Sequence, residues 1–204
     1  MTTVGVYGGT FDPPHLGHLA AAQEAAEALG LDRVLFVPSE RNPLKLHDQI
    51  SPTEHRLAMT ALAVADNPVF ELSMADIGGD GPSFTVDLLA RLQRQLPVGT
   101  DLAFISGMDV LHELHRWRDP LLMLALARLI VIERPGQVTL HPEEVDVRIP
   151  GASRRISVVK TAGVAVSSTD LRERVAAGRS IRYLVPDSVA AYIAEHGLYR
   201  AVET

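Results

Sequence analysis

Short apolar runs alternate along this chain with longer segments in which apolar residues recur at helical spacing. The short runs, typical of buried strands, are residues 4–7, 34–37, 69–74, 102–105, 129–132 and 156–159. The helical segments are residues 16–29, 51–65, 84–96, 120–127 and 168–177, and a last helix follows Pro186 and ends near His196. This alternation predicts βαβ units, and therefore an α/β fold with a mainly parallel sheet.

Turn and cap residues mark several boundaries. Gly30 follows the first helix where a C-terminal glycine is favoured, and Ser51 with Glu54 predicts a capping box at the start of the next helix. The polar residues 39–49 predict a loop. Because no repeat or long linker divides the chain, we expect one domain over residues 1–204, with residues from about 165 to 204 as a small helical appendage.

Composition narrows the classes of protein. The 204 residues are 47% hydrophobic and 22% charged, as in soluble globular domains, with 19 basic and 25 acidic residues and a net charge of −6. This acidic balance argues against nucleic acid as a partner. The absence of cysteine excludes disulfides and thiolate chemistry. No apolar run is long enough to span a membrane, so we expect a cytoplasmic protein. The sequence leaves open whether it forms a homo-oligomer.

The first candidate site follows the first predicted strand. In a parallel α/β sheet, ligands bind beyond the carboxyl ends of the strands. Here Gly8 and Gly9 allow a close backbone approach, and His15 and His18, three residues apart, share one face of the helix start. The histidines fit a structural turn, a metal site without an evident third ligand, or donors to phosphate. A P-loop is excluded, since neither of the two lysines follows such a loop.

The second candidate site begins another predicted helix. Ser167, Ser168 and Thr169 place hydroxyl groups at the helix start, and Arg172 lies one turn further on. Hydroxyls, free main-chain amides and a guanidinium together suit an anion such as phosphate. In isolation, the same residues also fit an ordinary cap in which Ser167 bonds to Asp170, with a solvated arginine.

Taken together, these motifs resemble those of a known family. The segment from Gly8 to His18 resembles the H-x-G-H signature of the nucleotidyltransferase superfamily, and its G-G-T-F-D-P form resembles the bacterial nicotinate-nucleotide adenylyltransferases. Residues 166–172 are similar to that family's I-S-S-T-x-x-R motif. The resemblance covers nearly the whole chain. It implies a Rossmann-like fold and transfer of the adenylyl group from ATP to nicotinate mononucleotide, which gives nicotinate adenine dinucleotide and pyrophosphate.

The resemblance also implies roles for single residues. Catalytic roles fall to His15, His18 and Arg172, and Mg²⁺ is expected on the ATP phosphates rather than in a protein site. The implied ATP-binding residues are Gly8, Gly9, Thr10, Phe11, His15, His18, Gly107, Asp109, Ser167, Ser168, Thr169 and Arg172. The implied mononucleotide-binding residues are Lys45, Thr85, Trp117 and Arg118.

Several of these residues also have simpler interpretations. Lys45 fits an exposed solvated lysine, Trp117 a core residue, and Asp109 and Thr85 helix caps. Arg118 stands where the family often has an aromatic residue, and it would supply a cation for the nicotinate carboxylate.

Three other functions compete with this hypothesis. The acceptor could be nicotinamide mononucleotide or phosphopantetheine, because related adenylyltransferases share H-x-G-H. A class I aminoacyl-tRNA synthetase is excluded, since the chain is too short and has no K-M-S-K-S-like segment. A non-catalytic nucleotide-binding module would keep the glycines but would not need the histidines and the arginine, which stabilise a leaving group.

Overall fold

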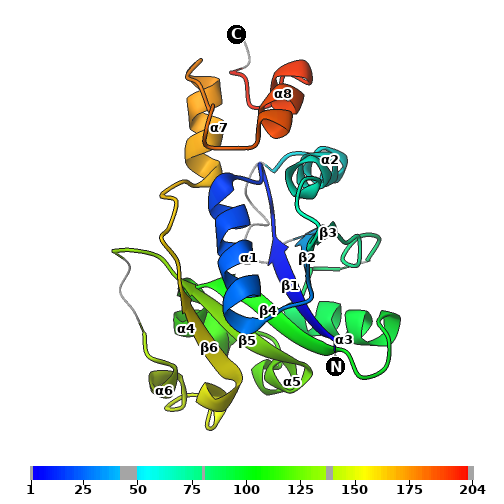
Figure 1. Ribbon diagram of the computed structural model, residues 1–204, viewed down its shortest axis with the longest axis vertical. Coiled ribbons are helices and arrows are strands. Elements are labelled where there is room, and N and C mark those ends of the chain that lie inside the picture. The colour runs from blue at the N-terminus through cyan, green and yellow to red at the C-terminus, as the bar shows by residue number, and fades with distance from the viewer. Residues whose placement is uncertain (1, 42–49, 80, 137–139, 202–204) are drawn as a thin grey trace.

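A six-stranded parallel sheet forms the centre of the computed structural model, which describes residues 2–41, 50–79, 81–136 and 140–201. Its strands are β1 (Thr3–Gly9), β2 (Arg33–Pro38), β3 (Phe70–Leu72), β4 (Asp101–Gly107), β5 (Ala127–Glu133) and β6 (Ile156–Lys160). They lie in the order β3-β2-β1-β4-β5-β6, and all neighbouring strands are parallel (Figure 1). This Rossmann-like order reverses between β1 and β4 and confirms the predicted α/β class.

Helices cover both faces of this sheet. The longer helices of the structure are α1 (Leu16–Leu29), α2 (Thr53–Val64), α3 (Thr85–Gln95), α5 (Pro120–Leu126), α7 (Ser168–Ala176) and α8 (Asp187–Glu195), of which α7 and α8 lie beyond the ends of the strands. Shorter turns are α4 (Asp109–Glu113), η2 (Leu114–Arg116), α6 (Pro142–Val145) and η3 (Ala152–Arg155). Within the described residues, no helix is both long enough and apolar enough to cross a membrane.

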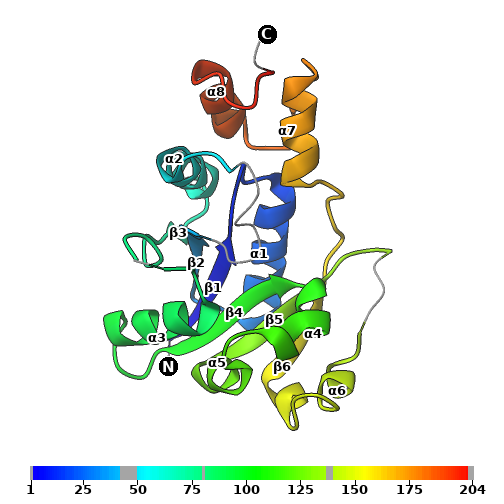
Figure 2. The same cartoon turned by 180° about the vertical axis from the view of Figure 1, so that it is seen from behind.

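Alternate residues along the central strands enter two different apolar cores. Val4 and Val6 of β1 join the core beneath α3, α4 and α5 (Figure 2), whereas Tyr7 joins the core beneath α1. Alanines such as Ala22 and Ala25 bring α1 close to its face of the sheet. Because both faces are covered, the strands are apolar along most of their length, as the sequence pattern indicated.

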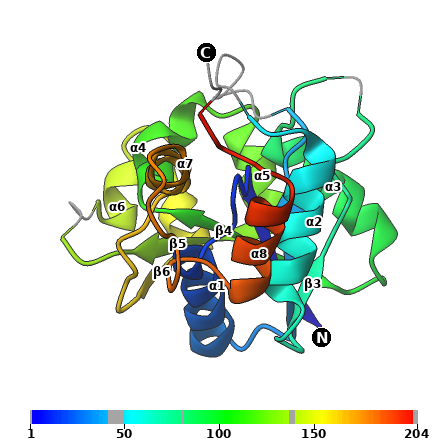
Figure 3. The same ribbon diagram turned by 90° about the horizontal axis from the view of Figure 1, so that it is seen from above.

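A third apolar cluster joins the C-terminal helices to α2. It combines Met59 of α2 with Leu171 of α7 and Val189 and Ile193 of α8. Figure 3 shows α8 beside α2, and Figure 1 shows α7 and α8 above α1 and α2, on the side toward which the strands run. The C-terminal segment is therefore packed against the end of the sheet where a ligand is expected.

The structure corrects the predicted start of α2. No side chain caps this helix, so the capping box expected from Ser51 and Glu54 is wrong. The main chain of Ser51 is instead held by other groups: its N–H donates to Asp12 and its carbonyl accepts from Arg56. A local pattern could not reveal this, because Asp12 lies 39 residues away in sequence.

Candidate active site

A cleft of about 380 Å³ opens at the carboxyl ends of β1 and β4. Its lining includes Gly8 and Gly9 at the end of β1 and Ser106 near the end of β4. A larger cavity of about 510 Å³ lies near the opposite, amino ends of the strands and contains none of the predicted site residues. The cleft at the carboxyl ends is the candidate site, because ligands of parallel sheets bind where the strand order reverses.

His15 and His18 stabilise the first turn of α1, because the imidazole of each accepts a hydrogen bond from the main-chain N–H of the other. The main-chain N–H of His18 donates to Nδ1 of His15 at 3.3 Å, and that of His15 donates to Nδ1 of His18 at 3.2 Å. The two rings stack with centroids 3.6 Å apart. Because each Nδ1 accepts a hydrogen bond, we place the proton of each neutral ring on Nε2. In each ring Nδ1 accepts within the helix start, whereas Nε2 carries a proton that it can donate. A structural role and a phosphate-binding role are therefore compatible.

The two histidines differ in burial. The side chain of His15 is only 2% exposed, and this burial, followed by the charge of Arg134, lowers its pKa to about 4. His18 is half-buried and lies nearer the surface. His18 is therefore the imidazole better placed to donate to a ligand, whereas His15 is held neutral beneath it.

This burial predicts that acid destabilises the protein through His15. The folded-state pKa of about 4 lies below the ordinary value of 6.5, so between these pH values the unfolded chain binds a proton that the folded protein does not. The contribution to the free energy of unfolding is full above about pH 6.5 and falls by roughly 3 kcal/mol as the pH approaches 4. Urea unfolding from pH 4 to 7 measures it against His15→Asn, which keeps a capping acceptor but does not titrate. The same pH dependence in both proteins would contradict the prediction.

Arg134 is a site residue that sequence reasoning missed. It directly follows β5, at the same edge of the sheet as Gly107. Its charge acts on His15, and it also bonds to the Tyr7 hydroxyl, whose pKa burial raises to about 12. The available signal was a cation two residues after the predicted strand 129–132, before Pro135 and Gly136.

At two glycines in the first motif, neighbouring groups lie so close that a side chain would collide with them. A Cβ on Gly17 would lie 3.0 Å from Nδ1 of His15 and 3.1 Å from the carbonyl oxygen of Val164. A Cβ on Gly9 would lie 2.9 Å from the ring of Phe11. That ring is buried in the core beneath α1, so the side chain of Phe11 packs inside the fold and does not face the site.

The second motif caps its own helix. The Ser167 hydroxyl accepts from the main-chain N–H of Asp170 at 3.1 Å, as the simpler interpretation expected. The next hydroxyl, of Ser168, donates to the carbonyl of Pro13 at 2.9 Å. The start of α7 is therefore attached to the turn that precedes α1.

Arg172 strengthens this attachment. Its guanidinium donates to the main-chain carbonyl of Asp12 at 2.8 Å and to the Thr169 hydroxyl at 3.3 Å. Asp12 and Arg172 are 160 residues apart in sequence, and Asp12 lies three residues before His15. The structure thus brings the two predicted motifs together at one end of α1.

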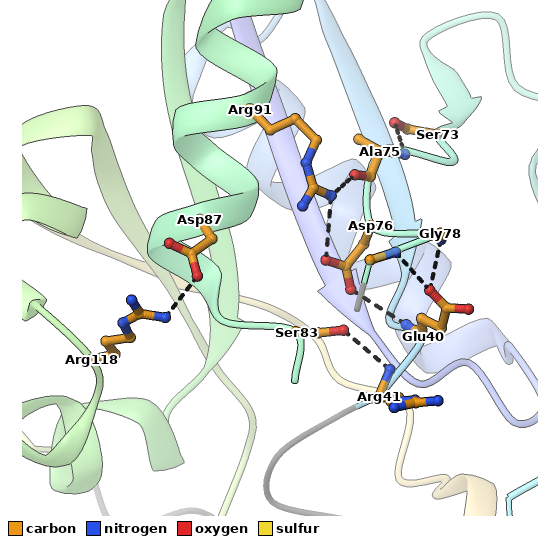
Figure 4. A network of polar contacts seen from close by, with 11 residues as sticks. Glu40, Arg41, Ser73, Ala75, Asp76, Gly78, Ser83, Asp87, Arg91 and Arg118 are labelled. Atoms are coloured by element: carbon orange, nitrogen blue, oxygen red, sulfur yellow. Dashed lines mark hydrogen bonds and ion pairs between the residues drawn. The ribbon is translucent and has the colours of Figure 1, made fainter. Parts of the chain in front are cut away.

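Three of the predicted mononucleotide residues line the cleft. Thr85 begins α3, and Trp117 packs edge-to-face on Phe104 with ring centroids 6.0 Å apart. Arg118 forms an ion pair with Asp87 at 2.9 Å, shown in Figure 4. The cation expected to meet a ligand carboxylate is therefore already paired at the rim of the cleft.

The remaining predicted residues lie at the edge of the site or outside the described chain. Among the described residues, nothing lies within 4 Å of a Cβ built on Gly107, so the end of β4 is open. Asp109 is exposed at the first position of α4. Lys45, with most of the predicted loop 39–49, lies outside the described residues.

A polar network supports one wall of the cleft (Figure 4). Burial raises the pKa of Asp76, whose carboxylate accepts from the main-chain N–H of Glu40 and lies 4.0 Å from Arg91. Glu40 in turn accepts from the main-chain N–H groups of Gly78 and Gly79 at 2.6 and 3.2 Å. These bonds hold the end of β2 against the segment that leads into α3.

The buried Arg56 joins three segments behind the site. Its guanidinium, 2% exposed, donates to carbonyls after β1, after β2 and before α2, and to one hydroxyl. The acceptors are Thr10 at 3.1 Å, Ser39 at 2.7 Å, Ser51 at 3.0 Å and the Thr53 hydroxyl at 2.9 Å. No local sequence pattern distinguishes this arginine from a solvated one.

Comparisons with known proteins agree with this fold and identify the family. A family model described as cytidylyltransferase-like matches residues 6–174. A Roseiflexus protein named "Probable nicotinate-nucleotide adenylyltransferase" is 48% identical over 97% of this chain and 98% of its own length. A Thermomicrobium roseum protein of the same name is 44% identical over 100% of this chain and 94% of its own length. The Plasmodium falciparum nicotinic acid mononucleotide adenylyltransferase complexed with NaAD has the same fold, with a TM-score of 0.76 and 16% identity over 98% of both chains.

Proposed function

Since this chain belongs to the cytidylyltransferase-like family and, within it, to the nicotinate-nucleotide adenylyltransferases, we propose that it transfers the adenylyl group of ATP to nicotinate mononucleotide. The products are nicotinate adenine dinucleotide and pyrophosphate. The observation that carries this proposal is the hydrogen bond from Arg172 to the carbonyl of Asp12, because it brings the two phosphate-binding motifs to one site.

The reaction needs little covalent chemistry from the protein. The phosphate of the mononucleotide is ionised at neutral pH, so it attacks the α-phosphorus without a general base. The bond to pyrophosphate breaks in line, and negative charge collects on the leaving group. Catalysis then consists of positioning and charge stabilisation. We assign donation to the triphosphate to Nε2 of His18 and to the guanidinium of Arg172.

The two substrates would occupy neighbouring places, the mononucleotide in the cleft and ATP beside it. We place the mononucleotide near Thr85 and Trp117, which line the cleft, with the ring of Trp117 available to a pyridine ring. Since Arg118 is paired with Asp87, we propose that it shapes the rim rather than binding the carboxylate directly. The adenosine part of ATP would lie by the open end of β4, near Gly107 and Asp109.

We propose that a divalent cation enters this site with its substrate. The described residues include no group of three or more histidine, aspartate or glutamate side chains arranged to hold a metal ion. We therefore propose that Mg²⁺ binds to the ATP phosphates, where it neutralises charge on the polyphosphate. The cytoplasmic location stays a prediction from the sequence, which leaves open whether the protein forms a homo-oligomer.

A panel of acceptors tests the proposed function. Pyrophosphate release is measured with ATP and nicotinate mononucleotide, nicotinamide mononucleotide or phosphopantetheine. We expect the highest kcat/KM with nicotinate mononucleotide, and product mass then identifies the dinucleotide. Faster turnover of another acceptor would replace the proposed substrate. Binding of ATP without turnover of any acceptor would instead support a non-catalytic module.

A further inference from the structure

Asp12 is a buried carboxylate in the catalytic turn that the proposed mechanism does not use. It is 1% exposed and lies between the Gly8-Gly9 strand end and His15. Its Oδ2 accepts from the main-chain N–H of Ser51 at 3.0 Å, and its Oδ1 accepts from the Tyr199 hydroxyl at 2.6 Å. A buried carboxylate is stable only when it is paired or hydrogen-bonded, so these contacts fix the position of Asp12.

Tyr199 is therefore tied to a turn that lies 187 residues earlier in the chain. Its hydroxyl also contacts the sulfur of Met59 at 3.8 Å. Burial, the charge of Asp12 and this hydrogen bond raise the pKa of Tyr199, so the phenol keeps its proton and donates. A hydrogen bond from a neutral donor to a buried carboxylate is among the stronger ones in proteins.

Both faces of the turn are held by the C-terminal segment. The side chain of Asp12 is bound by Tyr199, and its main-chain carbonyl is bound by Arg172 at 2.8 Å. Nearby, the main-chain N–H of Leu16 donates to the carbonyl of Leu184 at 3.0 Å. These bonds leave the segment that carries His15 little freedom to move relative to α7.

We infer that Tyr199 is a positioning residue, which acts through Asp12 to hold the histidine turn and Arg172 in the arrangement that the leaving pyrophosphate needs. The inference rests on the proposed function of the same site. Tyr199 itself touches no reacting atom. A small displacement of the turn would misplace donors that matter most in the transition state, so kcat is the parameter that responds.

Tyr199→Phe tests the inference, with Tyr192→Phe as the matched control. Both changes delete one hydroxyl, but that of Tyr192 bonds to His55 between α2 and α8, at 2.9 Å. We expect Tyr199→Phe to lower kcat by about 10- to 100-fold, with both KM values within about threefold of wild type. Tyr192→Phe should keep kcat within about twofold. Unchanged kcat in Tyr199→Phe, or an equal loss in the control, would overturn the inference.

A second variant and a second readout keep the test decisive. If Tyr199→Phe does not fold by circular dichroism, Asp12→Asn takes its place with the same expected kcat loss and the same overturning result. In the ligand-free proteins, NMR shifts of the His15 and His18 imidazoles should change in Tyr199→Phe and not in Tyr192→Phe. Failure of the wild type to turn over nicotinate mononucleotide refutes the proposed function, whereas unshifted imidazoles in Tyr199→Phe refute the positioning role.

Discussion

Replacing His18 by alanine is expected to lower kcat by about 100- to 1,000-fold, which corresponds to roughly 3–4 kcal/mol of lost transition-state stabilisation. The reason is that Nε2 of His18 is the donor nearer the surface at the helix start, whereas His15 is buried beneath it. The KM for the mononucleotide should change far less, because the lost interaction develops with the leaving pyrophosphate. Steady-state pyrophosphate release measures both parameters.

Two further substitutions separate the donor role of His18 from its capping role. An asparagine side chain can replace Nδ1 as acceptor for the main-chain N–H of His15 but leaves no donor at the position of Nε2. His18→Asn should therefore be as slow as His18→Ala while it unfolds at a urea concentration near that of wild type. His18→Gln should recover part of kcat. The exposed His196, replaced by alanine, is the control. Rates of His18→Ala within about threefold of wild type would show that His18 does not stabilise the leaving group.

The largest loss of stability is expected from Arg56→Met. Methionine fills part of the space but leaves three carbonyls and a hydroxyl without their donor and removes the charge that faces Asp12. Breaking a buried charged network of this kind costs about 3–5 kcal/mol in the free energy of unfolding. Urea denaturation with circular dichroism measures the loss.

Two comparisons sharpen this prediction. Arg56→Lys keeps the charge, but an ammonium cannot reproduce the planar fork of donors, so an intermediate loss is expected. Arg94 is an exposed residue of α3, so Arg94→Met should change the free energy of unfolding by less than about 0.5 kcal/mol. If the free energy of unfolding of Arg56→Met were less than about 1 kcal/mol below that of wild type, other groups or water would have to satisfy the four acceptors.

Features with a local cause were predictable from the sequence. The α1 helix begins at Leu16 and ends at Leu29 as expected, because its alanine pattern and the left-handed Gly30 at its end are both local signals. The six strands were found for a similar reason, since buried parallel strands are short apolar runs. The short α4 and α6 were missed, because segments of five and four residues carry too little periodicity.

Contacts between distant segments could not be predicted. The sequence indicates that Arg118 is a cation, but not that Asp87, 31 residues away, neutralises it. It likewise does not show that Asp12, Arg56 and Tyr199 meet behind the first motif. Motif resemblance indicated the residues that we propose to contact substrate, whereas these supporting residues follow no short pattern and depend on how the chain packs.

The joining of Asp12 to Tyr199 has a consequence for protein synthesis. The histidine turn leaves the ribosome early, whereas the residues that brace it are made 160 and 187 positions later. The emerging polypeptide should therefore be able to form much of its sheet before it is competent for turnover. The protein should then become able to catalyse turnover only late, after α8 and Tyr199 have been synthesised.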